Sequence, residues 1–489
     1  MRANLLALGT LALPLANANA NPREGMTPAF PPLVATYDKN YISCANANWP
    51  PPGPGDNTGS LLKPQRPDKE LQAALAEVSP ERIKEIISKL VSFGTRHTLS
   101  PQNDTTRGIG AARDWIAAEF ERYAEVSDGR LTVETNGYTQ QPTPRIPEPV
   151  KISNVQATLE GTEDPTRYYL TMGHYDTRVS DILNWWDDQP GANDDASGVA
   201  VAMELARVMA KHKHRASLVF AAVAGEEQGL FGSGFMAQTY RNESANIKGV
   251  LNVDLVGSSV GSRGEKEPHT IRMFCQGPPL TESDRQTSTR LTIGGENDSP
   301  ARNLGRFIAE VATNKYTDMK VAMIYRLDRF LRGGDHRSFL EAGYGAAVRF
   351  TEPNENFDHQ HQDTRVEDGV QYGDLEEFLD YDFIARVARV DLAAMWSLAN
   401  APGQVQNVTI DTASLDNDSR LSWAKLDDDE VEGYEVVWRP TSAPQWTHAA
   451  FVGDVAETTV ELSIDNVIFG VRSVGKNGYK SPASIPFPS

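Results

Sequence analysis

Histidine and acidic residues occur together at several separate places in this chain of 489 residues, in spacings that suit metal-binding chemistry. The first pair is His174 and Asp176, which follows the short apolar segment 168–172. In an extended segment, residues i and i+2 point the same way, so these two side chains can act together. A carboxylate beside a metal-binding histidine fixes the tautomer of the imidazole. Because such a triplet is short and often arises by chance, it indicates a metal site only in combination with other residues.

Adjacent acidic residues form the next two clusters. Asp194 and Asp195 precede a segment with helical periodicity, where one acidic residue is a common N-cap. A cap does not account for two neighbouring aspartates, whose like charges repel unless a cation neutralises them. Glu226 and Glu227 follow the apolar segment 218–223. A solvated helix start would explain this pair equally well, but one carboxylate of such a pair can also bind metal while its neighbour acts as general base.

Two further groups complete the set of candidate ligands. Asp254 lies within the apolar segment 250–255, and a strand interior is an unfavourable place for an aspartate. The polar segment 356–364 contains His359 and His361, each of which alone is typical of a surface loop. Taken with the other clusters, one of these histidines completes a mixed nitrogen and oxygen ligand set that suits zinc. A carboxylate that bridges two ions would give a two-metal hydrolytic site.

The elements that must position these clusters alternate between strand and helix patterns. Short apolar runs predict strands at 168–172, 217–223, 250–255 and 346–350. Periodic apolar residues predict two helices between 71 and 91, and others at 108–123, 196–210, 231–240, 301–313, 336–342 and 375–398. This alternation predicts an α/β fold with a mixed, mostly parallel sheet flanked by helices. Each ligand cluster lies at or near the end of a predicted strand, where open α/β sheets bind their ligands.

The chain contains four regions that differ in composition and in hydrophobic pattern. Residues 1–20 have an apolar core and small residues at cleavage spacing, which predict a secretory signal peptide. Residues 21–66 are rich in proline and glycine and predict an extended arm. Residues 67–401 contain the α/β pattern. From 405 to 489 the chain has only short strand patterns, which predict a small β-sandwich resembling a fibronectin type III module.

Composition excludes some functional classes. With 39% hydrophobic and 23% charged residues the chain belongs to the globular class. A net charge of -19 argues against nucleic-acid binding, which needs a basic surface, and the N-terminal apolar run is too short for a membrane anchor. Two cysteines, Cys44 and Cys275, allow at most one internal disulfide. Sequons for N-glycosylation, which suit a secreted and extracellular protein, lie at Asn103, Asn242, Asn297, Asn407 and Asn417.

The order of these motifs carries a family resemblance. The series His-x-Asp, Asn-Asp-Asp-x-Ser-Gly, Glu-Glu, a strand Asp and a late His resembles that of the M28 metallopeptidases, which include secreted leucine-type aminopeptidases, over about residues 67–401. The resemblance implies two zinc ions. It implies that His174 and Asp254 hold one ion, that Glu227 and a late histidine hold the other, and that Asp194 bridges them.

The same resemblance implies roles for the neighbouring residues. Asp176 is expected to orient His174, and Glu226 to act as the general base that passes the proton of water to the leaving amine. The peptide bond between Asp194 and Asp195 is expected to be cis.

Two positions depart from the family pattern. The late histidine is often followed four residues later by aspartate, which favours His359 through Asp363, whereas the preceding Asn-aromatic-x-x-Gln-His phrase favours His361. We choose His361 and keep His359 as the alternative. Some relatives polarise the scissile carbonyl with an aromatic hydroxyl, for which Tyr325 is the candidate here.

Several functions remain open at this point. The resemblance favours an aminopeptidase that acts on peptide or protein substrates, and a carboxypeptidase is the nearest alternative. A glutaminyl-cyclase-like acyltransferase would use a single zinc ion. A non-catalytic binding protein would use the C-terminal β-sandwich, which could also contact a surface or a polymeric substrate. Trp185 and Trp186 either line a specificity pocket or pack on the domain surface.

Overall fold

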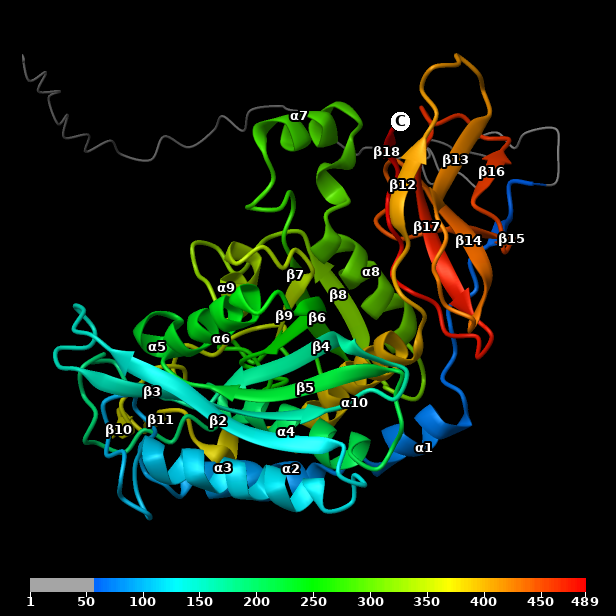
Figure 1. The fold of residues 1–489 in the computed structure, drawn as a ribbon. Helices are drawn as coiled ribbons and strands as arrows, with labels where there is room; N and C mark the ends of the chain where they lie inside the picture. Colours follow the sequence, from blue (N-terminus) through cyan, green and yellow to red (C-terminus); the bar gives the residue numbers. More distant parts are fainter. Residues whose placement is uncertain (1–56) are drawn as a thin grey trace, which may run out of the picture.

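A computed structural model describes residues 57–489 (Figure 1). The predicted signal peptide and most of the predicted arm lie outside the described residues. The strands of the α/β domain are β2 Leu131–Gln140, β3 Val150–Leu159, β4 Asp164–His174, β5 Ala216–Val223, β6 Asn246–Val253, β7 Thr270–Cys275, β8 Lys320–Ile324 and β9 Ala347–Thr351, with a separate hairpin of β10 Arg365–Glu367 and β11 Val370–Tyr372. Its helices are α1 Lys69–Glu77, α2 Pro80–Val91, α3 Ile109–Ala124, α4 Ala196–Met209, α5 Glu226–Gly229, α6 Phe231–Asn242, α7 Asp284–Thr292, α8 Pro300–Ala312, α9 His336–Glu341 and α10 Tyr381–Asn400.

An eight-stranded mixed sheet forms the centre of this domain, in the order β2-β3-β5-β4-β6-β9-β7-β8. The four strands β5, β4, β6 and β9 run parallel to one another, while β3 and β7 pair with this block in the antiparallel sense. The predicted fold class is therefore confirmed. Strands β2, β3, β7 and β8 were not predicted, and they extend the parallel block on both sides.

Alternating side chains of the central strands enter two separate cores. In β5, Leu218 and Phe220 belong to the larger core, whereas Val219 and Ala221 belong to the smaller core on the opposite face. All of these residues are buried because a strand directs successive side chains to opposite faces and helices cover both faces. The continuous apolar run of β5 is the sequence signature of this arrangement.

Helices form a layer on each face of the sheet (Figure 1). Helices α5, α6 and α9 lie on one face, and α3, α4 and α10 lie on the other, with α1 and α2 packed outside α4 and α10. The long helix begins at Tyr381, six residues later than predicted, because Asp380 caps it by accepting the N–H of Phe383 at 3.0 Å. Leu375 to Leu379 instead form a short 3₁₀ turn and its flanks.

The C-terminal region forms two four-stranded sheets with a shared apolar core, as a β-sandwich requires. Its strands are β12 Gln406–Ile410, β13 Ser419–Ala424, β14 Val431–Pro440, β15 His448–Gly453, β16 Glu457–Val460, β17 Val467–Gly475 and β18 Phe487–Pro488. The fourth strand of one of these sheets is β1 Ser60–Leu61, which pairs with β15. The end of the predicted N-terminal arm therefore belongs to the C-terminal sandwich.

Buried polar contacts join the sandwich to the α/β domain. Asp298 is fully buried, with Arg306 Nη1 at 2.9 Å and Arg439 Nη2 of β14 at 2.7 Å. The Tyr479 hydroxyl donates to Asp68 at 2.7 Å and lies 2.9 Å from Trp396 Nε1. None of the helices within residues 57–489 is long and apolar enough to cross a bilayer.

Cys275 is buried at the end of β7, where burial raises the pKa of its thiol to about 12. Cys44 lies outside the described residues, so a disulfide between the two cysteines stays a prediction.

Candidate metal centre

Neighbouring parallel strands place the predicted ligands at one edge of the sheet. His174 is the last residue of β4, Glu227 lies in α5 shortly after β5, and Asp254 directly follows β6. Because β5, β4 and β6 are adjacent and parallel, their carboxyl ends share this edge. The sequence placed Asp254 inside a strand, which is wrong: β6 ends at Val253 and the aspartate begins the following loop.

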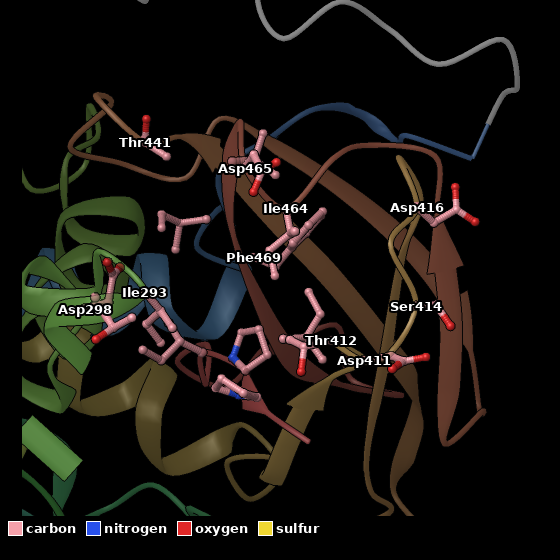
Figure 2. Close-up of a pocket in the computed structure, with 18 of the residues that line it drawn as sticks. Ile293, Asp298, Asp411, Thr412, Ser414, Asp416, Thr441, Ile464, Asp465 and Phe469 are labelled. Carbon is pink, nitrogen blue, oxygen red and sulfur yellow. The ribbon is translucent and has the colours of Figure 1, made fainter. Parts of the chain in front are cut away.

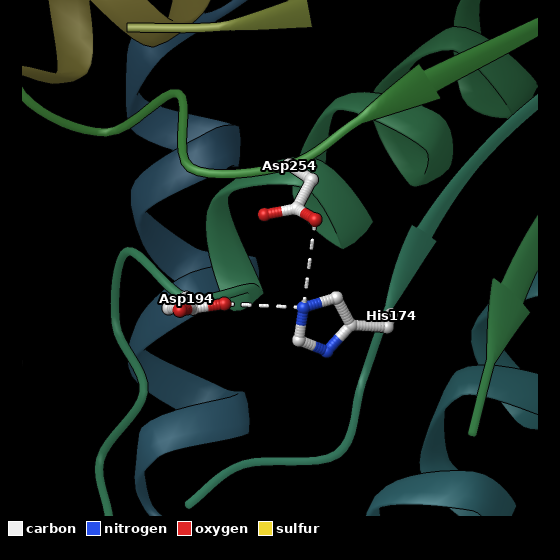
Figure 3. A group of neighbouring side chains, drawn as sticks. All are labelled: His174, Asp194 and Asp254. Carbon is white, nitrogen blue, oxygen red and sulfur yellow. Dashed lines mark ion pairs between the residues drawn. The ribbon is translucent and has the colours of Figure 1, made fainter. Parts of the chain in front are cut away.

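Five ligand-type side chains form two groups that share one aspartate. In the first group, His174 Nε2 lies 3.1 Å from Asp194 Oδ1 and 3.9 Å from Asp254 Oδ2 (Figure 3). In the second, His361 Nε2 lies 2.9 Å from Asp194 Oδ2 and 2.9 Å from Glu227 Oε1. Asp194 therefore directs one carboxylate oxygen into each group.

The donor atoms fit metal ions. Glu227 Oε1 is buried and makes no hydrogen bond within the described part of the chain, although His361 Nε2 is close to it. His174 Nδ1 lies 3.1 Å from the backbone carbonyl of Asp176, to which it can donate. This hydrogen bond leaves Nε2 with a free lone pair that faces the carboxylates. Imidazole nitrogens and carboxylate oxygens in groups of three match the ligands of catalytic zinc.

His359, the alternative ligand, does not join either group. Its ring stacks on Phe378 with the centroids 3.6 Å apart and the planes at 11°, and it lines a separate small pocket with Glu352 and Asp374. His361 reaches the cluster from a backbone with φ of 56°. In the structure His361, and not His359, thus lies in a ligand group. The sequence motifs supported both histidines.

Asp176 acts on both sides of the cluster. Its carbonyl accepts from His174, and its carboxylate Oδ1 is 3.5 Å from His174 Nδ1. The two carboxylate oxygens also accept the backbone N–H groups of Glu226 and Glu227, each at 3.2 Å. Asp176 is fully buried, so these bonds fix the start of α5 relative to β4. The sequence indicated only the contact with the histidine.

Asp195 has a different function from its neighbour. Its carboxylate accepts the backbone N–H groups of His174 at 3.0 Å, Gly198 at 2.9 Å and Leu255 at 3.3 Å. It therefore caps α4 and joins the ends of β4 and β6. The bond between Asp194 and Asp195 is cis, as the resemblance implied.

Three further residues support the ligands, and of these only Gln360 belongs to a motif noted in the sequence, the Asn-aromatic-x-x-Gln-His phrase. Gln360 Nε2 donates to Asp194 Oδ2 at 3.0 Å. Asp374 accepts the backbone N–H of Asp194 at 2.7 Å. Arg349 Nη2, fully buried on β9, lies 2.8 Å from Asp254 Oδ1. Each is distant in sequence from the residue it contacts, so the folded structure was needed to show these contacts.

When no cation is present, the electrostatics of the centre favour the protonated forms of Glu226 and His361. Burial raises the pKa of Glu226 well above its ordinary range, and the charge of Glu227 adds to this. Against the lowering effect of burial, Glu227 and Asp194 raise the pKa of His361 to about 10. Divalent cations binding here must therefore displace protons.

The ligand groups open into a cavity of about 350 Å³. Its lining includes Glu226 and the five ligand-type residues, together with Arg145, Arg178, Arg329, Arg332 and Arg337. Tyr325, the predicted aromatic hydroxyl, is not at this site: it donates to the carbonyl of Pro444 at 3.0 Å. Trp185 and Trp186 are exposed and are not among the residues that line the cavity.

A larger cavity, of about 790 Å³, lies between the sandwich and the segment around Ile293 and Asp298 (Figure 2). Its lining contains no histidine or glutamate, Asp298 is already paired with two arginines, and none of its aspartates belongs to a ligand group found among the described residues. The chemistry therefore belongs to the smaller cavity.

The chain is similar to several known proteins. Residues 154–380 match the model of peptidase family M28. A probable zinc metalloprotease of Pyricularia oryzae is 63% identical over 99% of this chain and 98% of its own length. Another probable zinc metalloprotease, from Pyrenophora tritici-repentis, is 59% identical over 94% of each chain. Among solved structures, the LapA aminopeptidase of Legionella pneumophila is 20% identical, with a TM-score of 0.47 over 68% of this chain and 76% of LapA.

Proposed function

Because the chain belongs to peptidase family M28 and is a zinc-dependent peptidase, we propose that it is a secreted exopeptidase, and more specifically an aminopeptidase, with two zinc ions. The observation that carries this proposal is that Asp194 belongs to both of the three-residue ligand groups. In the proposal, His174 and Asp254 would hold one ion, Glu227 and His361 would hold the other, and Asp194 would contribute one oxygen to each.

The chain's own residues would complete the catalytic site. Bound zinc ions would supply Lewis acidity and lower the pKa of water. Glu226 begins α5 and lines the same cavity as the ligands. Its carboxylate would accept the proton from the attacking water and pass it to the leaving amine. Asp176 would hold Glu226 in place through the backbone N–H of that residue.

Blocked peptides test the proposed activity. An aminopeptidase should release the first residue of a carboxyl-amidated peptide and should not cleave an acetylated one. Removal of metal with a chelator should abolish the release, and added zinc should restore it. Cleavage of only acetylated peptides with a free carboxyl end would overturn the aminopeptidase assignment.

A carboxypeptidase is the second candidate because of the arginines that line the cavity, which could bind a terminal carboxylate. The glutaminyl-cyclase alternative is less well supported, since it needs one zinc ion and the chain has two ligand groups.

Secretion and glycosylation are part of the same proposal. Asn103, Asn242, Asn407 and Asn417 are exposed. Asn297 is half-buried and its side chain accepts from Arg302, so we expect no glycan there. Mass spectrometry of secreted protein, before and after removal of N-glycans, would check which sequons are occupied. We also assign the sandwich, as a fibronectin type III-like module, a role in contacting a surface or polymer.

A further inference from the structure

Five arginines line the cavity beside the ligand groups, and they come from separate parts of the chain. Arg145 lies between β2 and β3, Arg178 follows β4, Arg329 and Arg332 lie between β8 and α9, and Arg337 is in α9. Convergence of five guanidinium groups in a cavity of about 350 Å³ is unusual, since like charges raise one another's electrostatic energy. The arginines therefore need counter-charges.

Two of these arginines have few partners of their own. Arg145 Nη1 donates to the backbone carbonyl of Glu227 at 3.0 Å. No carboxylate lies within ion-pair distance of Arg145 in residues 57–489. Arg178 Nε donates to the carbonyl of Val179 at 3.2 Å and comes no closer than 3.9 Å to Glu227 Oε2. Both guanidinium groups thus lie beside the metal centre with most of their donors unused.

The loop after β8 adds further positive charge. Arg329 and Arg332 share a single carboxylate, that of Glu355, which Arg272 also contacts at 3.3 Å. Arg329 is nearly buried and also binds Asp328 and the carbonyl of Gly333, so it stabilises the conformation of the loop. The Arg332 side chain is 33% exposed and contacts Glu355 through Nη1 alone, which leaves Nε and Nη2 available.

The carboxylates of the cavity do not offset this charge. Its lining contains four, of which Asp194, Glu227 and Asp254 are the proposed metal ligands and Glu226 is the proposed base. Two divalent cations would neutralise these groups. Arg337 pairs with Glu341 at 2.7 Å and Arg329 pairs with Asp328 at 3.0 Å. Arg145, Arg178 and the free donors of Arg332 would then face the substrate space as a positive surface, which attracts anions.

From this geometry we propose that the cavity binds a carboxylate of the peptide substrate, with Arg145, Arg178 and Arg332 as its recognition groups. The inference rests on the proposed peptidase function and names its substrate class. A guanidinium group binds a carboxylate with two parallel hydrogen bonds, and the fork of Arg suits this geometry better than Lys. The carboxylate can belong to an acidic side chain or to the free end of a short peptide.

Isosteric substrates separate these two sources. The amide peptides Glu-Ala-Ala-NH₂ and Gln-Ala-Ala-NH₂ differ only in side-chain charge, and Gln-Ala-Ala with a free end differs from the latter only at its terminus. Since a hydrogen bond to a charged group contributes about 1.5–3 kcal/mol, we expect kcat/KM for at least one charged peptide to exceed that of Gln-Ala-Ala-NH₂ about 10- to 150-fold. The charged peptide that is hydrolysed faster shows whether the carboxylate belongs to a side chain or to the free C-terminus. Hydrolysis of all three peptides at equal, non-zero rates would overturn the proposal.

Substitutions assign the preference to the arginines. Arg145→Gln and Arg332→Gln should each lower the ratio of kcat/KM between the preferred charged peptide and its neutral isostere by about tenfold or more. Arg263→Gln is the matched control because Arg263 is 87% exposed, pairs with Glu265 and does not line the cavity. A ratio that is unchanged in both cavity variants would contradict the assignment.

A binding measurement distinguishes this inference from the peptidase assignment. Calorimetry on the zinc-loaded Glu226→Gln protein would compare binding of the charged and neutral peptides without hydrolysis. Tighter binding of a charged peptide supports carboxylate recognition even if the wild-type protein hydrolyses none of the peptides. That lack of hydrolysis would refute the proposed exopeptidase activity alone. Equal affinity for the charged and neutral peptides would refute carboxylate recognition.

Discussion

Adjacent acidic residues at the metal centre have different roles. Glu226 and Glu227 both begin α5, but only Glu227 belongs to a ligand group. Asp194 faces the ligands, whereas Asp195 binds backbone N–H groups. In each pair one carboxylate is available for metal and its neighbour for another purpose, so substitutions of neighbouring residues should have different effects.

Glu226→Gln should lose activity and keep its zinc. The amide has nearly the same shape as the carboxylate but cannot accept the proton of water, and loss of a general base costs about 10²- to 10⁴-fold in rate. Zinc content by atomic absorption and kcat on a peptide substrate would be measured on the same sample. Turnover equal to that of wild type would refute the proposed base.

His361→Ala should retain one zinc ion instead of two, because it removes a ligand from only one of the two groups. His359→Ala is the matched control: its ring stacks on Phe378 outside both groups, so its zinc content should stay at two. Metal analysis after dialysis would check both variants. The reverse pattern would mean that the alternative histidine is the ligand.

The individual site residues differed in how far the sequence could predict them. His174, Asp194 and Glu227 were predicted because each belongs to an acidic or histidine cluster near an apolar run, and Asp254 because it is a lone aspartate in an apolar segment. Arg349 belongs to a predicted strand and has no such pattern, yet it contacts Asp254. The choice between the late histidines depends on loop backbone angles, which residue spacing does not determine.

Element-scale prediction succeeded where both faces of an element are buried or where an amphipathic period is clear. Strand β5 is buried at every position, and its apolar run identified it. Strand β2, at the sheet edge, reads LTVETNGYTQ and is buried only at Leu131. Polar edge strands carry little hydrophobic signal, so β2 was missed.

A buried carboxyl between α10 and β4 makes stability depend on pH. Asp391 is fully buried, its Oδ2 lies 2.5 Å from Thr171 Oγ1, and its Oδ1 has no hydrogen-bond partner in the described part of the chain. Burial raises the pKa of Asp391 to about 7, and the hydrogen bond from Thr171 opposes this only in part. The folded protein therefore keeps this group protonated in a range where an unfolded aspartate, of pKa about 3.9, is ionised.

The sign of the effect follows from this difference in proton binding. Between about pH 4 and pH 7 the folded state holds a proton that the unfolded state lacks, so the free energy of unfolding falls as pH rises. The free energy of unfolding of Asp391→Asn, taken relative to that of wild type, should therefore rise by up to about 4 kcal/mol between pH 4 and pH 8. Urea unfolding at both pH values would measure it, with the exposed Asp382→Asn on the same helix as control. A difference from wild type that does not change with pH would contradict the account.

At the scale of the whole molecule, the sandwich and the α/β domain share a buried ion cluster. Asp298→Asn should lower the free energy of unfolding by about 3–5 kcal/mol, because it leaves Arg306 and Arg439 buried without their carboxylate. The control Glu457→Gln removes an exposed ion pair with Arg420 and should cost about 1 kcal/mol or less. Equal stability of the two variants would mean that the domains do not depend on this contact.

Domain-scale contacts were beyond sequence analysis. The strand pattern after residue 405 predicted the sandwich, but the pairing of β1 with β15 joins residues nearly 390 positions apart. Nothing in the sequence near Ser60 and Leu61 indicates that partner. Long-range pairing of short segments depends on the assembled fold.

The central proposal is that Asp194 would bridge two zinc ions. Anomalous diffraction at the zinc edge, on crystals of protein loaded with zinc, measures this most directly. We expect two peaks about 3.5–4 Å apart with one Asp194 oxygen directed to each. A single peak, or two peaks without Asp194 between them, would contradict the account.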